Sequence, residues 1–268
     1  MVIRQGCMNK FLELSLEYAQ QPAHAYLDDL FKVYPTIPNA IRSVDTAKWE
    51  SVECAFARRD NLKLVESLLS MDLFPIKDSY VAFLRHDRAA LLRNPNTVNR
   101  LAGELYGMGL GKIYERSTLP KETNRQIGPL FRYWLRSNAL GIAPVPIEEF
   151  AKTEGNAILD AGDAVMKAFA KERLGYGRDK GLDFIARFNG KYVIGEAKFL
   201  TDFGGHQNAQ FNDAIATLES PSKAVNIAIM DGVLYIKNNN KMHKELTGKY
   251  GGCNIMSALL LRDFLHSI

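Results

Sequence analysis

The dipeptide Asn189-Gly190 constrains the fold of this chain more than any other feature of its sequence. The strand-like segment LDFIARF precedes it at 182–188, and KYVIGEAKFL follows it at 191–200. Asn-Gly between two such segments is typical of a type I′ turn, because both central residues of that turn need a positive φ angle. The sequence therefore predicts an antiparallel hairpin.

Three charged side chains interrupt the apolar pattern of this hairpin. Glu196 and Lys198 are two residues apart, so they project from the same face of their strand. The turn returns the chain so that Asp183 lies near the level of Glu196. Burying charge without a partner is costly, and the apolar flanks YVIG and FL favour burial. The alternative is a solvated cross-strand ion pair, the usual role of a Glu and a Lys on one strand face.

This arrangement of charges predicts a cation site. Two carboxylates repel each other unless a cation lies between them, and oxygen ligands of this kind suit Mg²⁺. Such an ion bridges protein carboxylates and phosphate oxygens, and it lowers the pKa of a bound water. The adjacent lysine can orient or deprotonate that water, or hold the anionic phosphate.

Helical patterns surround the predicted hairpin. Residues 8–115 space their apolar side chains by three and four, as helices do. Two further helices are predicted within 124–137 and over 156–177, separated by a proline-containing connector at 141–150. We therefore expect a largely helical N-terminal region over 1–118, which binds DNA or dimerises, and a catalytic core over 119–268.

Strands return after the hairpin. AVNIAIM at 224–230 predicts a buried strand, and Asp231-Gly232 predicts a turn into another strand, VLYIK. The C-terminal segment IMSALLLRDFL fits a strand or a helix. Helices on both sides of a short set of strands favour an α/β core, with a mixed central sheet flanked by helices.

The composition and the motifs of the chain argue against several classes of protein and of functional site. The net charge of +4 permits a nucleic-acid partner without requiring one. The cysteines at 7, 54 and 253 are too far apart for a CxxC pair, which argues against a zinc site and for reduced thiols in a cytosol. We expect a cytoplasmic prokaryotic protein, since no signal-peptide pattern or membrane-spanning apolar run is present. No GxxxxGK[ST], GxSxG or HExxH motif occurs, and the glycine-rich GMGLGK follows a helix pattern.

Asp183, twelve intervening residues and the sequence Glu196-Ala197-Lys198 resemble the PD-(D/E)XK nuclease superfamily, and type II restriction endonucleases in particular. The resemblance implies a restriction-endonuclease-like core and a divalent-metal-dependent phosphodiesterase. Asp183 and Glu196 would be metal ligands, the Ala197 carbonyl a third ligand, and Lys198 the catalytic lysine. Mg²⁺ is the cofactor that this resemblance implies.

The resemblance is clearest over 155–265, although Leu182 stands where the family carries a proline. Gln207 resembles a glutamine that some members carry in the helix after the lysine, near the metal or the scissile phosphate. Asp160 and Asp163 precede the hairpin, and related nucleases often take an extra carboxylate from a helix in that place. The alternative is that each of these two acids is an ordinary surface residue without a role at the metal.

Candidate DNA-contacting residues follow the hairpin. The segment 201–218 runs from a Gly-Gly turn into a predicted helix, and neutral hydrogen-bonding side chains gather at its start. Gln and Asn read adenine edges in the major groove, whereas the alternative is a polar cap with a solvated first turn. Arg125 and Gln126 are candidates for facing DNA, with an ordinary helix N-terminus as the alternative. The candidates in 201–218 are His206, Asn208, Gln210 and Asn212.

The sequence thus predicts a Mg²⁺-dependent type II restriction endonuclease. It would hydrolyse double-stranded DNA at a short specific sequence and leave a 5′-phosphate and a 3′-hydroxyl. A homodimer would place one active site on each strand of a palindromic sequence. The alternatives are a repair, junction-resolving or nicking nuclease of the same fold, and a non-catalytic DNA-binding protein whose hairpin carries only a structural ion pair.

Overall fold

The structure, a computed structural model, describes residues 8–21, 23–35, 43–119 and 127–268. The chain divides into two compact units. The described residues of 37–122 form the first, which we call the helical unit. The described residues of 1–36 and 123–268 form the second, which we call the core unit. The core unit is therefore built from two separate stretches of sequence.

The helical unit has its own apolar core, and side chains cap the starts of three of its helices. The carboxylates of Asp45, Asp60 and Asp78 accept hydrogen bonds from backbone N–H groups in the first turns of three helices. Leu64, Leu101 and other aliphatic residues are fully buried between the helices. The helices are α3 (Thr46–Ala57), α4 (Asn61–Leu69), α5 (Ser79–His86), α6 (Ala90–Arg93), α7 (Pro95–Met108) and α8 (Leu110–Ser117).

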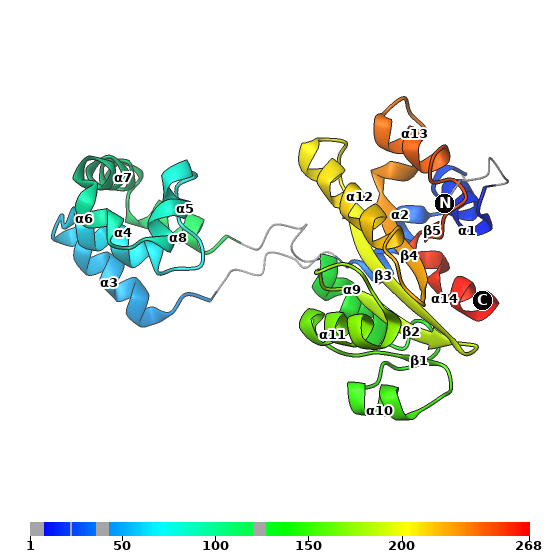
Figure 1. The fold of residues 1–268 in the computed structure, drawn as a ribbon. Coiled ribbons are helices and arrows are strands. Elements are labelled where there is room, and N and C mark those ends of the chain that lie inside the picture. Colours follow the sequence, from blue (N-terminus) through cyan, green and yellow to red (C-terminus); the bar gives the residue numbers. More distant parts are fainter. Residues whose placement is uncertain (1–7, 22, 36–42, 120–126) are drawn as a thin grey trace. The chain divides into compact units, whose positions relative to one another are not determined.

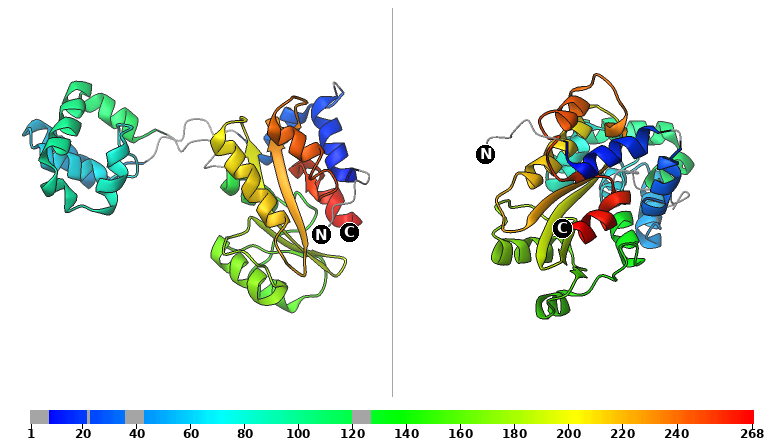
Figure 2. Two further views of the ribbon diagram at one scale, coloured as in Figure 1. Left: turned by 45° about the horizontal axis from the view of Figure 1, so that its top comes forward. Right: turned by 90° about the vertical axis from the view of Figure 1, so that its right-hand side faces the viewer.

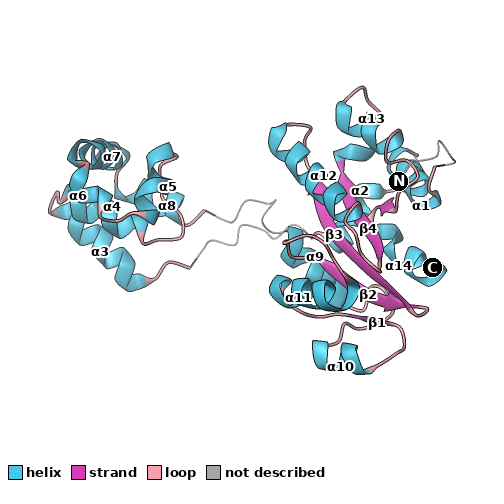
Figure 3. Cartoon of the chain, viewed as in Figure 1, coloured by secondary structure: helices cyan, strands magenta, loops and turns pink. Residues whose placement is uncertain are grey.

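A mixed five-stranded sheet forms the centre of the core unit, which confirms the predicted fold class (Figures 1 and 3). The strand order is β1-β2-β3-β4-β5, with antiparallel pairing from β1 to β3 and parallel pairing from β3 to β5. The strands are β1 (Ala157–Ile158), β2 (Phe184–Phe188), β3 (Lys191–Leu200), β4 (Val225–Gly232) and β5 (Ile255–Met256).

The predicted hairpin is confirmed as β2 and β3. Asn189 and Gly190 have φ angles of 50° and 76°, as a turn with two positive φ angles requires. The register pairs Phe184 with Gly195, and the N–H of Asp183 donates to the carbonyl of Gly195 at 3.2 Å. Asp183 therefore lies beside Glu196, because the strands run in opposite directions.

Helices cover both faces of the sheet (Figure 2). On the face that carries Ile194, α11 (Asp163–Leu174) packs against β2 and β3, and α12 (Gly205–Leu218) reaches Lys198 with its Asp213 side chain. On the opposite face, the Phe131 ring of α9 (Ile127–Arg136) lies 6.5 Å from the Phe184 ring. The helix α14 (Leu261–Ser267) lies on that second face, where His266 contacts Phe188.

Two N-terminal helices, α1 (Lys10–Gln20) and α2 (Tyr26–Val33), belong to the core unit. Their anchor is Asp231, a fully buried carboxylate at the end of β4. It accepts hydrogen bonds from the hydroxyls of Tyr26 and Tyr34, at 3.0 and 3.2 Å, and also from Ser257 and Ala258. The predicted boundary at residue 118 separates these helices from the core, whereas the structure packs them into it.

Several predicted boundaries differ from those of the structure. The segment 156–177 contains β1 before its helix, and α10 (Ile147–Lys152) begins within the predicted connector at 141–150. The C-terminal segment contains both of the predicted alternatives, β5 and α14. The core unit also contains α13 (Lys241–Thr247), which lies between β4 and β5 in the sequence. No helix among the residues described above has the length and apolar character to span a membrane.

The predicted strand VLYIK is wrong, because its first residues form a 3-10 helix at Val233–Tyr235. Gly232 has a φ angle of 100°, and a Cβ atom there would collide with the backbone oxygen of Leu200. The buried Tyr235 hydroxyl donates to the carbonyl of Met230 at 2.8 Å. The chain thus folds back over the end of β4 instead of pairing as a hairpin.

Candidate active site

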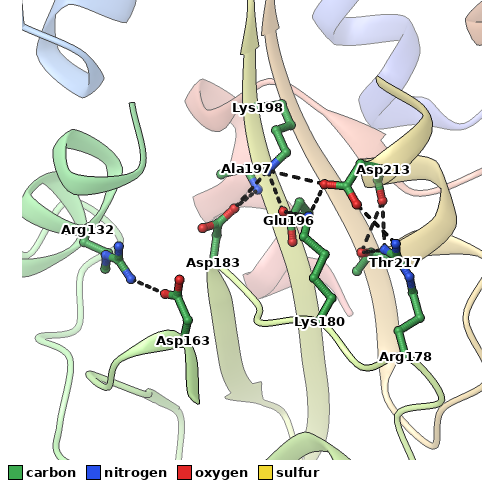
Figure 4. A network of polar contacts seen from close by, with 10 residues as sticks. All are labelled: Arg132, Asp163, Arg178, Lys180, Asp183, Glu196, Ala197, Lys198, Asp213 and Thr217. Atoms are coloured by element: carbon green, nitrogen blue, oxygen red, sulfur yellow. Dashed lines mark hydrogen bonds and ion pairs between the residues drawn. The ribbon is translucent and has the colours of Figure 1, made fainter. Parts of the chain in front are cut away.

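The three residues predicted to be catalytic come together at one edge of the sheet (Figure 4). Strand β3 continues past the end of β2, so Glu196, Ala197 and Lys198 lie where β2 no longer pairs. A cavity of about 260 Å³ opens there. Its lining residues are Ile127, Gly128, Asp183, Ala197, Lys198, Phe199, Gln210 and Asp213.

Asp183 is held at this edge by the backbone of β3. Its Oδ2 atom accepts a hydrogen bond from the N–H of Ala197 at 3.0 Å. The ammonium of Lys198 lies 3.6 Å from the same oxygen. The carboxylate is therefore fixed by one neutral donor and one cation, and Asp183 lines the cavity together with Ala197 and Lys198.

Glu196 is the most buried acid of the site, with only 3% of its surface exposed. Its Oε1 atom accepts from the ammonium groups of Lys198, at 2.5 Å, and Lys180, at 2.6 Å. Burial, and then the negative charge of Asp183, raise the pKa of Glu196, although the two ammonium groups oppose that shift. The Oε2 atom is also buried, and it has no hydrogen-bond partner among the described residues.

A third acid of the site, Asp213 on α12, was not predicted. Its Oδ2 atom contacts the ammonium of Lys180 and lies 3.9 Å from that of Lys198. Burial opposes ionisation of Asp213, but the hydrogen bond and charge of Lys180, followed by the hydrogen bond from Arg178 and the charge of Lys198, lower the pKa of Asp213 below its usual value. Burial likewise opposes the charge of Lys180, whereas its hydrogen bonds to Asp213 and Glu196 raise the pKa of Lys180.

Arg178 fixes the position of Asp213. Its guanidinium donates to Asp213 Oδ1 at 3.1 Å, to the backbone carbonyl of Asp213 at 3.0 Å and to the hydroxyl of Thr217 at 2.7 Å. The positions of Arg178, Lys180 and Asp213 in the sequence could have indicated that they belong to the site. Arg178 and Lys180 stand just before Asp183, and Asp213 follows Gln210 by three residues on one helix face.

Three predicted accessory residues do not line the cavity. Gln207 is buried, and its side-chain amide bonds to Thr201, accepting from the backbone N–H at 3.3 Å and donating to the hydroxyl at 3.0 Å. Gln207 therefore has a structural role, because it holds the residue that follows β3. Asp160 and Asp163 pair with arginines of α9, namely Arg136 at 2.7 Å and Arg132 at 2.6 Å, respectively.

Of the predicted DNA-contacting residues that the structure describes, Gln210 alone lines the cavity. It is hydrogen bonded to His206 at 3.1 Å. Asn208 donates to the carbonyl of Phe203, as a residue of a helix start does, and Asn212 is exposed. Arg125 and Gln126 lie outside the described residues. A larger cavity, of about 510 Å³, lies in the helical unit and contains none of the predicted site residues.

The donor atoms at this edge suit a hard cation. Within the described ranges, no group of three or more His, Cys, Asp or Glu side chains is placed to hold an ion. Ala197 points its N–H toward Asp183, and in a strand the C=O of a residue points to the same side as its N–H. The partnerless Oε2 of Glu196 and the Ala197 carbonyl thus add oxygen donors to the Asp183 carboxylate, a set that fits Mg²⁺.

Comparison with known proteins gives one match. A family model described as the Tsp45I type II restriction enzyme matches residues 9–268, which include both units of the chain. No curated protein and no solved structure matches the chain. The matched range begins before α1 and ends at the last residue of the sequence.

Proposed function

The chain belongs to the Tsp45I type II restriction enzyme family, and from that premise we propose that it is a Mg²⁺-dependent endonuclease of the PD-(D/E)XK type. It would hydrolyse double-stranded DNA at a short specific sequence. The observation that carries the proposal is the convergence of Asp183, Glu196 and Lys198 at one open sheet edge, with Glu196 almost fully buried. A buried acid with an unpartnered oxygen is costly in a site without function.

The oxygens of Asp183 and Glu196, with the carbonyl of Ala197, would hold Mg²⁺, which when bound supplies positive charge to the phosphate and lowers the pKa of a water. Lys198 reaches both acids and lines the cavity. Its ammonium orients the attacking water and holds the scissile phosphate beside the carboxylates. The water oxygen bonds to phosphorus as the bond to the 3′-oxygen breaks, which leaves a 5′-phosphate and, after protonation, a 3′-hydroxyl.

Recognition of DNA would involve residues beside the catalytic edge. Gln210 lines the cavity from α12, and its amide can bond to a base edge or to the DNA backbone. A homodimer with twofold symmetry would bring one active site to each strand of a palindromic sequence. The helical unit would bind DNA or dimerise, and the enzyme would act in a prokaryotic cytoplasm.

The direct test is plasmid cleavage with Mg²⁺, followed by mapping of the DNA ends. We expect double-strand cuts at one short sequence, and loss of cutting when Glu196→Gln replaces the buried acid. Glu219→Gln, at an exposed position of α12's end, is the matched control and should cut as the wild type does. Nicks without a defined sequence would favour the repair or nicking alternative. Full cleavage by Glu196→Gln would remove the proposed active site.

A further inference from the structure

The candidate active site carries more charged groups than the proposed chemistry uses. Hydrolysis as proposed involves two acids and one lysine. The structure adds Lys180, which pairs with Glu196, and Asp213, which lies near Lys198. Lys180 also contacts Asp213, and Arg178 joins the cluster through its ion pair with Asp213. Three carboxylates thus face three cationic side chains. The formal charges of the cluster already balance before any metal ion arrives.

Lys180 is the group that links the two sets. Its ammonium lies 2.6 Å from Oε1 of Glu196, and it also contacts Oδ2 of Asp213. Oε1 of Glu196 therefore accepts from two ammonium groups at once, since Lys198 lies 2.5 Å from the same atom. The negative charge of Glu196 is therefore balanced by the ammonium groups of Lys180 and Lys198.

We propose that Lys180 is an intramolecular competitor of the divalent cation, and this inference rests on the metal site of the proposed function. The ammonium of Lys180 contacts Oε1 of Glu196, one of the two oxygens of this proposed ligand. A divalent cation that approaches Glu196 meets this ammonium as a like charge a few ångströms away, and repulsion between like charges at that distance is strong in a half-buried site. The cation binds well only when Lys180 leaves.

Asp213 is the group that receives the displaced ammonium. Lys180 already contacts Asp213, so it can release Glu196 without losing its last ionic partner. Arg178 holds Asp213 in place through both a carboxylate oxygen and the backbone carbonyl. Lys180 can therefore move between one partner that is a metal ligand and one that is not, which makes it a positioning residue rather than a catalytic one.

The test is calorimetric titration of Ca²⁺ into the full chain without DNA, because Ca²⁺ takes the same oxygen ligands and needs no turnover. Lys180→Gln removes the competing charge and should tighten Ca²⁺ binding by about 10-fold or more. Lys180→Arg keeps the charge and should bind Ca²⁺ more weakly than Lys180→Gln. Lys171→Gln is the matched control, because it also loses an ion pair, at 2.8 Å from Asp179, but on an exposed surface.

The double variant Lys180→Gln/Glu196→Gln identifies the site that responds. It should lose the gain in Ca²⁺ affinity, because the side chain at position 196 is then an amide and no longer offers the cation a negative charge. Unchanged Ca²⁺ affinity in Lys180→Gln, with wild-type binding that depends on Glu196, would overturn this inference and leave the metal site standing. Absence of Ca²⁺ binding in both wild type and Lys180→Gln would overturn both proposals. An equal gain in Lys171→Gln or in Lys180→Arg would show that competition for Glu196 is not the cause.

Discussion

Asp183 and Ala197 are joined by a hydrogen bond, in which the backbone N–H of Ala197 donates to the Asp183 carboxylate at 3.0 Å. The bond ties the residue before β2 to the centre of the sequence Glu196-Ala197-Lys198. It forms where the two strands have stopped pairing. The position of the first acid of the site therefore depends on the backbone of the strand that carries the other two residues.

Two variants of Asp183 differ in whether they can keep this hydrogen bond. Asp183→Asn keeps an oxygen that can accept from Ala197 but removes the charge of the proposed metal ligand. We expect cleavage to fall by ~10²-fold or more, while thermal melting and DNA binding in Ca²⁺ stay near the wild-type values. Asp183→Ala should in addition lose about 0.5–1.5 kcal/mol of stability with the hydrogen bond. Near-normal cleavage by Asp183→Asn would show that this acid is no ligand.

Lys198 lies between both acids, and its variants test whether it acts on the water or only balances charge. Lys198→Arg keeps the charge, but a guanidinium is larger and stays protonated. We expect both Lys198→Arg and Lys198→Ala to cleave ~10²-fold or more slowly. The measurement is single-turnover cleavage of a cognate duplex with Mg²⁺, beside a melting curve of each variant. Nearly full activity in Lys198→Ala would make this lysine structural.

Gln210 and Asn212 lie two residues apart on α12, but only Gln210 lines the cavity. We expect Gln210→Ala to slow cleavage unevenly across related DNA sequences, by ~1–3 kcal/mol at the preferred one, as loss of a base contact does. Asn212→Ala is the comparison on the exposed side of the helix and should change cleavage less. Rates on a panel of single-base variants of the site provide the measurement. An equal loss on every sequence would indicate a phosphate contact.

Asp231 predicts how stability depends on pH. Burial raises the pKa of Asp231 to about 7 from an ordinary value of 3.8, although the hydrogen bonds from Ser257, Ala258, Tyr26 and Tyr34 oppose the shift. Between these values the folded protein holds a proton that the unfolded chain has released. The free energy of unfolding therefore falls as pH rises from about 4 to about 7, by at most about 1.4 kcal/mol per pH unit from this group.

Urea unfolding at pH 5, 6, 7 and 8 measures this slope. Asp231→Asn stays neutral at every pH, so its difference from the wild type should change across the range and level off above pH 7. Asp263→Asn, on an exposed turn of α14, is the control and should keep the wild-type slope. Parallel curves for wild type and Asp231→Asn would show that this carboxyl does not bind the proton.

The separate core of the helical unit predicts that damage there is local. Leu101 is fully buried in that core, and Leu101→Ala should destabilise the helical unit by about 2–5 kcal/mol. Ca²⁺ binding by the core unit should persist in conditions that unfold the helical unit of this variant. Leu92→Ala, at an exposed position, controls for the change of side chain. Simultaneous loss of both units would show that they unfold as one.

The part of the site that could be predicted from the sequence is the part that local rules determine. Asn189-Gly190 specifies the turn, the turn sets the register, and the register brings Asp183 beside Glu196. The alternation of side chains along a strand then places Lys198 on the same face as Glu196. Each step uses residues close together in the chain, so pattern reasoning is sufficient.

The rest depends on contacts between distant segments. Asp213 reaches Lys180 across 33 positions of sequence, and Tyr26 reaches Asp231 across 205. No periodicity reports such pairings, so Asp213 and Lys180 were missed, and α1 and α2 were assigned to the wrong side of the predicted boundary. Gln207 was placed near the metal by resemblance, whereas its buried amide bonds to Thr201.

The division of the core unit into two stretches of sequence has a consequence for synthesis on the ribosome. The helical unit is one continuous stretch, so it can fold as soon as it emerges. Helices α1 and α2 emerge earlier, yet their partners lie far later in the sequence: Asn9 bonds to Gly251, and Ser257 and Ala258 complete the bonds around Asp231. A nascent chain that already displays Asp183, Glu196 and Lys198 still lacks β5, so the sheet that carries these residues stays incomplete until Ile255 and Met256 have emerged.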